Sequence, residues 1–271
     1  MLRFPVLLVL FALAPIAHAQ QGDETWKKLF TQGLYASTSK DYAKAEQSLI
    51  SALHEAERFG VDDLRVGSTQ NTLGLVYVAE GKFKEAESAY HKALAVFEKA
   101  YGEDSLDVAR VNFNIATVMF AEGQKAEALP YAKKAQQVYE GQLGGNSAST
   151  ASVLCMEGEA YRATKDYTQA EGLLRRCADI REAEGGVQNA DFADAIYSLA
   201  QLYVAEGKYA LADSRFKLSE KIRESTQGLT SPQLAQTLEE HSALLKSMGR
   251  TKDADRLSAL AAAIRRNQSK K

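Results

Sequence analysis

The stretch LGLVYVAEGKFKEAESAYHKAL, residues 73–94, decides the fold. Its first part places Leu73 and Tyr77 one helical turn apart, as the apolar face of an amphipathic helix does. Gly81 follows, a residue that adopts the left-handed conformation in which helices commonly end. A second apolar stripe with helical spacing then begins at Ala86. The stretch therefore predicts a helix, a short turn and a second helix.

The same pattern occurs six times along the chain. One Ala occupies the corresponding place in each second helix, at intervals of 41, 42, 42, 42 and 42 residues: Ala45, Ala86, Ala128, Ala170, Ala212 and Ala254. A small residue recurs likewise in each first helix: Gly33, Gly74, Ala116, Gly158, Ala200 and Ser242. Small side chains at both places allow two helices to approach closely. Because one hairpin is too small to bury its own apolar faces, stacked neighbours must share a core. We predict an all-α solenoid of six helix-turn-helix repeats.

The repeated pattern resembles the tetratricopeptide repeat. The residues that carry the resemblance are Leu73-Gly74-Leu75-Val76-Tyr77, then 81–87 and 90–94, and the pattern returns at 199–203. The 42-residue length and the loop YGEDSLDVA at 101–109 are similar to the longer variety found in kinesin light chains. The resemblance implies a right-handed superhelix whose first helices line a concave groove. For function it offers only an analogy.

We predict that the repeats fill residues 24–271, after a short extension at 20–23. The expected repeat boundaries, with the last repeat acting as a cap, are 26–63, 64–106, 107–148, 149–190, 191–229 and 230–266.

The first 19 residues have the layout of a secretory signal peptide. Arg3 precedes an apolar run at Phe4–Ala17, and Ala17-His18-Ala19 offers a cleavage point before Gln20. A membrane anchor is the alternative, but a span needs about 20 apolar residues. We predict an exported protein, periplasmic or secreted, that does not insert into the membrane after cleavage.

Charge and motifs argue against several functions. The 33 Lys and Arg residues nearly balance the 35 Asp and Glu residues, whereas a nucleic-acid partner requires a basic face. The four His are scattered without metal-ligand spacing, and no nucleophile elbow, phosphate loop or dinucleotide fingerprint is present. We therefore predict no enzyme activity, no cofactor, no metal site and no nucleic-acid partner.

The two cysteines, Cys155 and Cys177, fall on the two helices of the fourth repeat. An oxidising compartment permits a disulfide between them. Two buried free thiols are the alternative, because Cys177 occupies a place that other repeats fill with Ala. The sequence leaves both possibilities open.

A stripe of residues beside the packing face of the first helices is the predicted binding surface for a protein or peptide partner. It combines amides, which donate to and accept from a peptide backbone, with aromatic rings and two arginines. We expect Phe113 and Tyr197 to act as apolar anchors, and Arg110 and Arg162 to bind acidic groups of the partner. The members chosen are Asn71, Leu75, Arg110, Phe113, Asn114, Thr117, Arg162, Tyr197 and Gln201. These residues predict an exported scaffold or adaptor that binds a polypeptide segment in its groove. The alternatives are a structural subunit of a cell-envelope assembly, joined through its convex face or its ends, and an accessory holder for an envelope enzyme.

Overall fold

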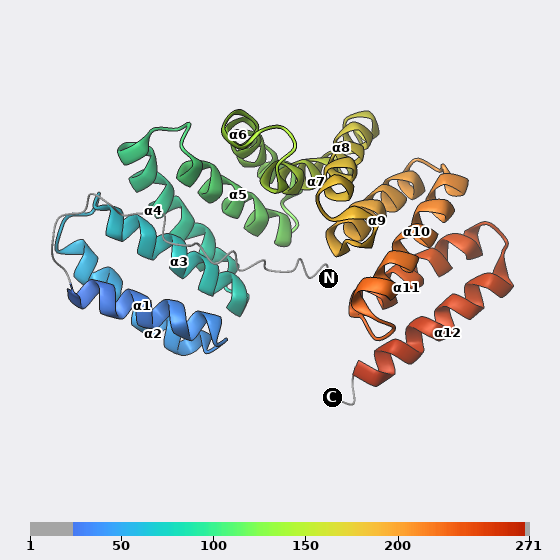
Figure 1. Cartoon of the computed structure of the whole chain (residues 1–271), viewed down its shortest axis with the longest axis horizontal. Coiled ribbons are helices and arrows are strands. Elements are labelled where there is room, and N and C mark those ends of the chain that lie inside the picture. The colour runs from blue at the N-terminus through green and yellow to red at the C-terminus, as the bar shows by residue number, and fades with distance from the viewer. Residues whose placement is uncertain (1–23, 269–271) are drawn as a thin grey trace. The chain divides into compact units, whose positions relative to one another are not determined.

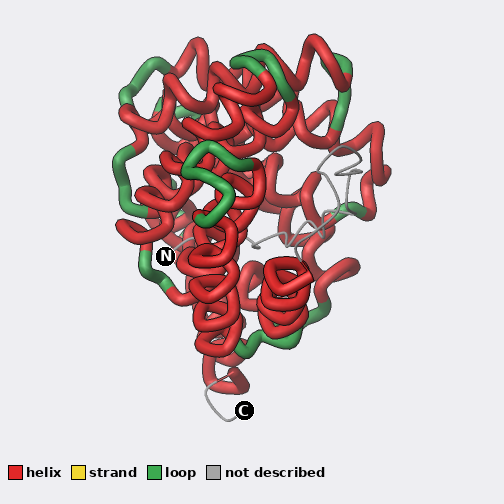
Figure 2. Tube along the Cα trace, turned by 90° about the vertical axis from the view of Figure 1, so that its left-hand side faces the viewer, coloured by secondary structure: helices red, strands yellow, loops and turns green. Residues whose placement is uncertain are grey.

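The computed structural model describes residues 24–268, so the predicted signal peptide and the extension at 20–23 lie outside the described residues. Within that range the chain is helical and contains no strand, as Figure 2 shows. The prediction of an all-α repeat solenoid is confirmed. The elements are α1 (Glu24–Thr38), α2 (Tyr42–Glu57), α3 (Leu64–Glu80), α4 (Phe83–Tyr101), α5 (Leu106–Ala121), α6 (Lys125–Leu143), α7 (Ala148–Ala163), α8 (Tyr167–Gly185), the 3₁₀ turn η1 (Gly186–Gln188), α9 (Ala190–Ala205), α10 (Tyr209–Gln227), α11 (Pro232–Ser247) and α12 (Thr251–Gln268).

The odd-numbered first helices and even-numbered second helices alternate along the chain (Figure 1). The chain divides after Ala135 into two compact units, here called the N-terminal and the C-terminal unit. In the N-terminal unit α1 packs on α2 and α3 on α4, and each second helix also contacts the next first helix. In the C-terminal unit the pairs are α7 with α8, α9 with α10 and α11 with α12. No helix among residues 24–268 combines the length and the apolar character that crossing a bilayer demands.

Small residues set the spacing within the hairpins. All six recurring alanines of the second helices are 0% exposed. A Cβ added to Gly74 would lie 2.4 Å from the ring of Tyr90, and one added to Gly158 would lie 2.6 Å from Leu174 Cγ. Each glycine therefore leaves room for a large side chain of the paired helix, which is buried in both cases.

The turn inside each of two hairpins places one residue in the left-handed conformation after the first helix, and this residue is glycine in one hairpin and lysine in the other. Gly81 ends α3 with φ 75°, and the following Lys82 caps α4 without a side-chain hydrogen bond. In the first repeat Lys40 adopts φ 61° instead, and Asp41 caps α2 by accepting from the backbone N–H of Lys44. A left-handed non-glycine residue costs about 1–2 kcal/mol, and an Asp cap stabilises by about 1 kcal/mol. The cap therefore offsets most of the strain.

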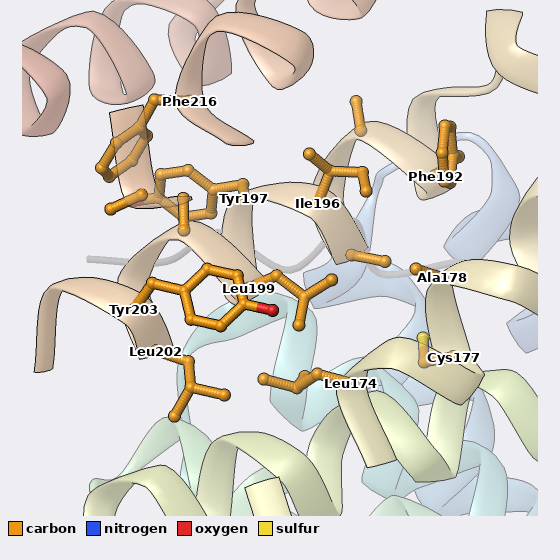
Figure 3. Packing of buried hydrophobic residues seen from close by; sticks show 14 of the residues in the cluster. Leu174, Cys177, Ala178, Phe192, Ile196, Tyr197, Leu199, Leu202, Tyr203 and Phe216 are labelled. Atoms are coloured by element: carbon orange, nitrogen blue, oxygen red, sulfur yellow. The ribbon is translucent and has the colours of Figure 1, made fainter. Parts of the chain in front are cut away.

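Figure 3 shows the core of the C-terminal unit, where Leu174 of α8 packs near Leu199, Leu202 and Tyr203 of α9. Phe216 of α10 lies edge-on to the ring of Tyr197, with centroids 6.0 Å apart. Residues of consecutive repeats thus share one apolar cluster.

A buried arginine joins three successive helices of this unit. Arg223 of α10 is 3% exposed, and its guanidinium lies 4.8 Å from the centre of the Tyr197 ring. It donates to Asp194 Oδ1 of α9 at 2.6 Å. It also donates to the Gln233 carbonyl and to Thr237 Oγ1 of α11, at 2.6 and 2.8 Å. One cation therefore links α9, α10 and α11.

A buried histidine forms the second polar link between α10 and α11. His241 is 1% exposed and stacks on Phe216, with ring centroids 5.3 Å apart. Its Nδ1 lies 2.6 Å from Glu220 Oε1 and its Nε2 lies 2.8 Å from Asp213 Oδ1. Asp213 also pairs with Lys217 and Arg250. Because a carboxylate faces each ring nitrogen, the doubly protonated imidazolium fits this site.

Stability is expected to fall at alkaline pH because of His241. Burial lowers the pKa of His241, but hydrogen bonds to Glu220 and Asp213 and their negative charges raise it, so that the pKa lies above its ordinary value of 6.5. A raised folded-state pKa gives stability that is complete below about pH 6.5 and is lost as pH rises through the folded-state value. Urea titrations at pH values from 6 to 9 should show the unfolding midpoint of the wild type falling. His241→Gln should remove that step, and identical pH profiles for the two proteins would contradict this assignment.

Candidate functional site

Two side-chain amides meet on neighbouring first helices of the N-terminal unit. Asn114 Nδ2 of α5 donates to Asn71 Oδ1 of α3 at 3.2 Å. Both residues are half-buried. Asn114 Oδ1 and Asn71 Nδ2 make no hydrogen bond with any residue among 24–268, so an acceptor and a donor remain for a ligand. The structure thus brings together the two asparagines that were predicted from spacing.

The other predicted residues of the N-terminal unit lie on the same two helices as the amide pair, within four positions of Asn71 or Asn114, and are also half-buried. Arg110 forms an ion pair with Asp107 on its own helix. Thr117 Oγ1 donates to the carbonyl of Phe113 at 2.8 Å, which leaves the hydroxyl oxygen as an acceptor. Leu75 lies one turn after Asn71 on α3. We call these six residues (Asn71, Leu75, Arg110, Phe113, Asn114 and Thr117) the α3–α5 face.

The remaining predicted residues belong to the C-terminal unit and are more strongly engaged. Arg162 of α7 is half-buried and donates through Nε and Nη2 to Glu159 Oε2, at 3.1 and 2.5 Å. Glu159 itself is 6% exposed. An acidic group of a partner would therefore compete with the Glu159 carboxylate of the same helix for the Arg162 guanidinium.

The prediction that Tyr197 is an apolar anchor for a partner is wrong. Tyr197 is 2% exposed, because its ring is packed against Phe216 and the guanidinium of Arg223. Its hydroxyl donates to Glu240 of α11, and burial together with the charge of Glu240 raises the pKa of Tyr197.

Gln201 joins the same polar cluster. Its Nε2 donates to the Tyr197 hydroxyl at 3.0 Å and to Glu240 Oε2 at 2.9 Å. Gln236 Nε2 of α11 donates to that hydroxyl at 2.9 Å. Glu240 and Gln236 were not among the predicted site residues, although both lie on the first helix α11, because the predicted stripe ended in the fifth repeat. The cluster ties α9 to α11.

The α3–α5 face suits recognition by hydrogen bonding and apolar contact. Amides, a threonine hydroxyl and apolar side chains on the α3–α5 face match the groups that a polypeptide backbone and its side chains present. Among residues 24–268, no three His, Cys, Asp or Glu side chains are grouped so that they could hold a metal ion.

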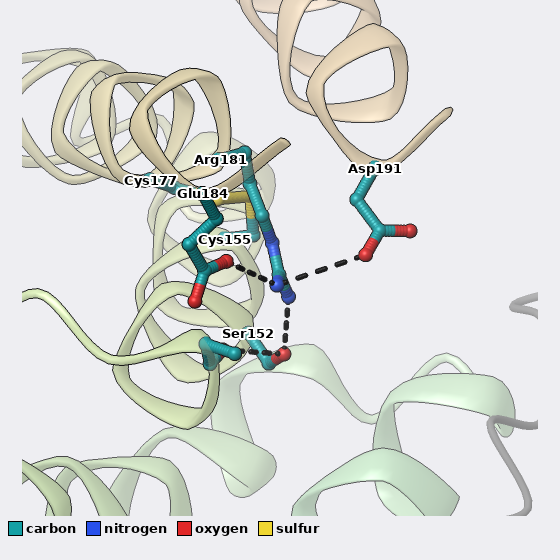
Figure 4. Close-up of a disulfide and its surroundings, with 7 residues drawn as sticks. Ser152, Cys155, Cys177, Arg181, Glu184 and Asp191 are labelled. Carbon is teal, nitrogen blue, oxygen red and sulfur yellow. Dashed lines mark hydrogen bonds and ion pairs between the residues drawn. A yellow bond between two sulfur atoms is a disulfide. The ribbon is translucent and has the colours of Figure 1, made fainter. Parts of the chain in front are cut away.

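A disulfide joins the two helices of one hairpin in the C-terminal unit. Cys155 of α7 and Cys177 of α8 are bonded, with Cα atoms 5.5 Å apart (Figure 4). Cys177 is 0% exposed. Beside the bridge, Arg181 donates to Ser152 Oγ at 2.6 Å and pairs with Glu184 and Asp191. Of the two possibilities that the sequence left open, the structure contains the bridge.

Solved structures of similar fold are distant in sequence. BtubC (BKLC) from P. vanneervenii is 22% identical with a TM-score of 0.67, and the alignment covers 89% of this chain and 92% of that chain. Kinesin light chain TPR-like repeats from Podosopora anserina are 17% identical with a TM-score of 0.62, covering 74% and 96%. A Rap protein complexed with Competence and Sporulation Factor is 16% identical with a TM-score of 0.56, covering 93% and 77%. These likenesses show the fold. No curated protein matches the sequence.

The sequence profile described as "Tetratricopeptide repeat" matches residues 29–99, 65–141 and 107–183, which together make up more than half of the chain. The matched segments contain the 73–94 stretch and the hairpins α3–α4 and α5–α6. Proteins built from such repeats are typically scaffolds for interaction with other proteins. This chain belongs to the tetratricopeptide repeat family.

Proposed function

We propose that this protein is an exported adaptor that binds a polypeptide segment of a partner protein on the α3–α5 face. The observation that carries the proposal is the Asn71–Asn114 amide pair, half-buried and with one donor group and one acceptor unused. A peptide backbone presents both an N–H and a C=O, so it satisfies the two unused groups together. Phe113 and Leu75 add apolar contact area beside them.

Two further observations support the proposal. The Rap protein of similar fold is described as complexed with Competence and Sporulation Factor, so an array of this kind holds a partner molecule. Export is supported by the composition of residues 1–19 and by the Cys155–Cys177 disulfide, since such bonds persist in oxidising compartments.

The intact mass of the protein purified from its native host should place the mature N-terminus at Gln20.

Replacing both asparagines should abolish most partner capture. Immobilised protein spanning residues 20–271 is incubated with a cell-envelope extract, and the bound proteins are quantified by mass spectrometry. Asn71→Ala with Asn114→Ala should reduce the proteins enriched on the wild type by about tenfold, as expected for the loss of roughly 1.4 kcal/mol. Helix content and melting should stay unchanged, because neither amide belongs to the core.

Gln47→Ala is the matched control, because Gln47 is an exposed amide on α2. It should leave capture unchanged. Equal capture by the wild type and the double asparagine variant would refute binding on the α3–α5 face.

A further inference from the structure

A groove of about 350 Å³ runs between the second helices α2 and α4, with α3 as its floor. Ile50 and Leu53 of α2 and Leu73 of α3 supply its apolar surface. Ile50 is 37% exposed, so apolar surface on the α2 side of the groove is open to solvent. The groove is formed by other residues than those of the α3–α5 face.

A buried amide without a partner lies in this groove. Gln70 of α3 lines it and is only 5% exposed. Its side chain makes no hydrogen bond with any residue among 24–268. An amide both donates and accepts hydrogen bonds, so the Gln70 side chain can pair with a peptide backbone that enters the groove.

A corresponding groove in the C-terminal unit shows that Gln70 is not required for packing. That groove lies between α8 and α10 over α9 and measures about 250 Å³. Ile196 takes the place of Gln70, and Leu199 takes the place of Leu73. The same fold is therefore compatible with an apolar residue at this position.

Cations dominate the α4 side of the groove. Lys84 and Lys92 line it, are exposed, and make no ion pair within the described part of the chain. Glu85 is the one carboxylate among the lining residues, so the net charge of the lining is positive. Lys92 follows Lys84 by eight positions along α4, which corresponds to a rise of about 12 Å.

We propose that the α2–α4 groove is a second docking site, for an acidic polypeptide segment. An apolar side chain of the segment contacts Ile50, Leu53 and Leu73, the backbone pairs with the Gln70 amide, and carboxylates reach Lys84 and Lys92. A rise of about 12 Å equals about four residues of extended chain, and alternate side chains of such a chain face the same way. The favoured motif is therefore an acidic residue, a spacer, an apolar residue, a spacer and a second acidic residue.

Selection from a random library tests the motif directly. Phage displaying random 12-residue peptides are selected on the immobilised chain with its disulfide intact, and the enriched sequences are read. Acidic–apolar alternation should be enriched on the wild type. On Lys84→Glu with Lys92→Glu, enrichment should change to basic peptides.

A labelled peptide from the wild-type selection is then titrated by fluorescence anisotropy. The charge-reversal variant should weaken binding by at least about tenfold, and Gln70→Ile by several fold. Gln70→Ile copies the residue of the corresponding groove, so its circular dichroism and melting should match the wild type. Lys28→Glu with Lys44→Glu is the control, since both lysines are exposed and lie outside the groove.

Two results would overturn the proposal. One is a wild-type selection without acidic–apolar enrichment, and the other is a selected peptide that binds the groove variants within twofold of the wild type. The Asn71→Ala and Asn114→Ala variant separates this site from the α3–α5 face, because it should retain the peptide. If the asparagine variant loses the acidic peptide and the groove variants keep it, the groove proposal fails while the proposed function stands.

Discussion

Asp194→Ala is expected to lower the free energy of unfolding by about 3 kcal/mol, and Arg223→Met by clearly less. The first change leaves the Arg223 guanidinium, 3% exposed, without its carboxylate. Removing one partner of a buried pair costs roughly 3–5 kcal/mol, because the other charge stays desolvated. The low end applies here, since the Asp194 side chain is 40% exposed. The second change replaces the buried cation by an apolar chain of similar length.

Urea titrations of the two single variants and the double variant test this asymmetry. The double variant should be more stable than Asp194→Ala alone, because it no longer buries an unpaired charge. Lys217→Ala is a suitable control, since this exposed lysine of α10 forms its ion pair with Asp213 and not with Asp194. If Arg223→Met costs more than Asp194→Ala, the contribution of Arg223 lies in its hydrogen bonds to α11 and its contact with Tyr197.

Replacing both cysteines by alanine should cost about 3 kcal/mol of stability, the value that the chain-entropy model gives for closing a loop of this size. The two cysteines are separated by 22 positions. Packing should survive the change, because corresponding second helices already hold alanines that are 0% exposed, such as Ala52 and Ala93. The loss should therefore come mainly from the unfolded chain gaining freedom.

The measurement compares urea midpoints of oxidised wild type, reduced wild type and the double alanine variant. The last two should coincide, well below the first. Thiol counting in denatured, unreduced protein supplies the check: two reactive thiols would mean that no bridge forms in solution.

The fold could be predicted because its determinants are local and repeated. The six alanines at near-constant spacing are all fully buried, and glycines such as Gly74 meet a large side chain of the paired helix. Helical spacing identifies such positions from the sequence of a single helix.

The site was predicted less completely because contacts between helices decide it. Spacing placed Asn71 and Asn114 correctly on neighbouring first helices, where they pair. It also placed Tyr197 on the same stripe, but packing against Phe216 and Arg223 from α10 buries that ring. A stripe one residue wide cannot distinguish these cases, because the neighbouring helix determines which side chain is covered.

The disulfide was left open for a similar reason. Its formation depends on how closely α7 and α8 approach, and packed helices often hold Cα atoms further apart than a bridge allows. Gly158, one turn from Cys155, brings α7 against Leu174, one turn from Cys177. The same small residue that builds the repeat therefore brings the two cysteines to a Cα separation of 5.5 Å.

The bridge also has a mechanical consequence. When the two ends of the chain are pulled apart, force passes from Cys155 to Cys177 through the sulfur atoms, and the residues between them, 156–176, carry no load. At about 3.4 Å per residue, 22 positions span about 75 Å, whereas the bridge holds the two Cα atoms 5.5 Å apart, so the oxidised chain should reach a contour length about 70 Å shorter than the reduced one. A stretched molecule would thus keep one closed loop in its α7–α8 hairpin after the other hairpins had unfolded.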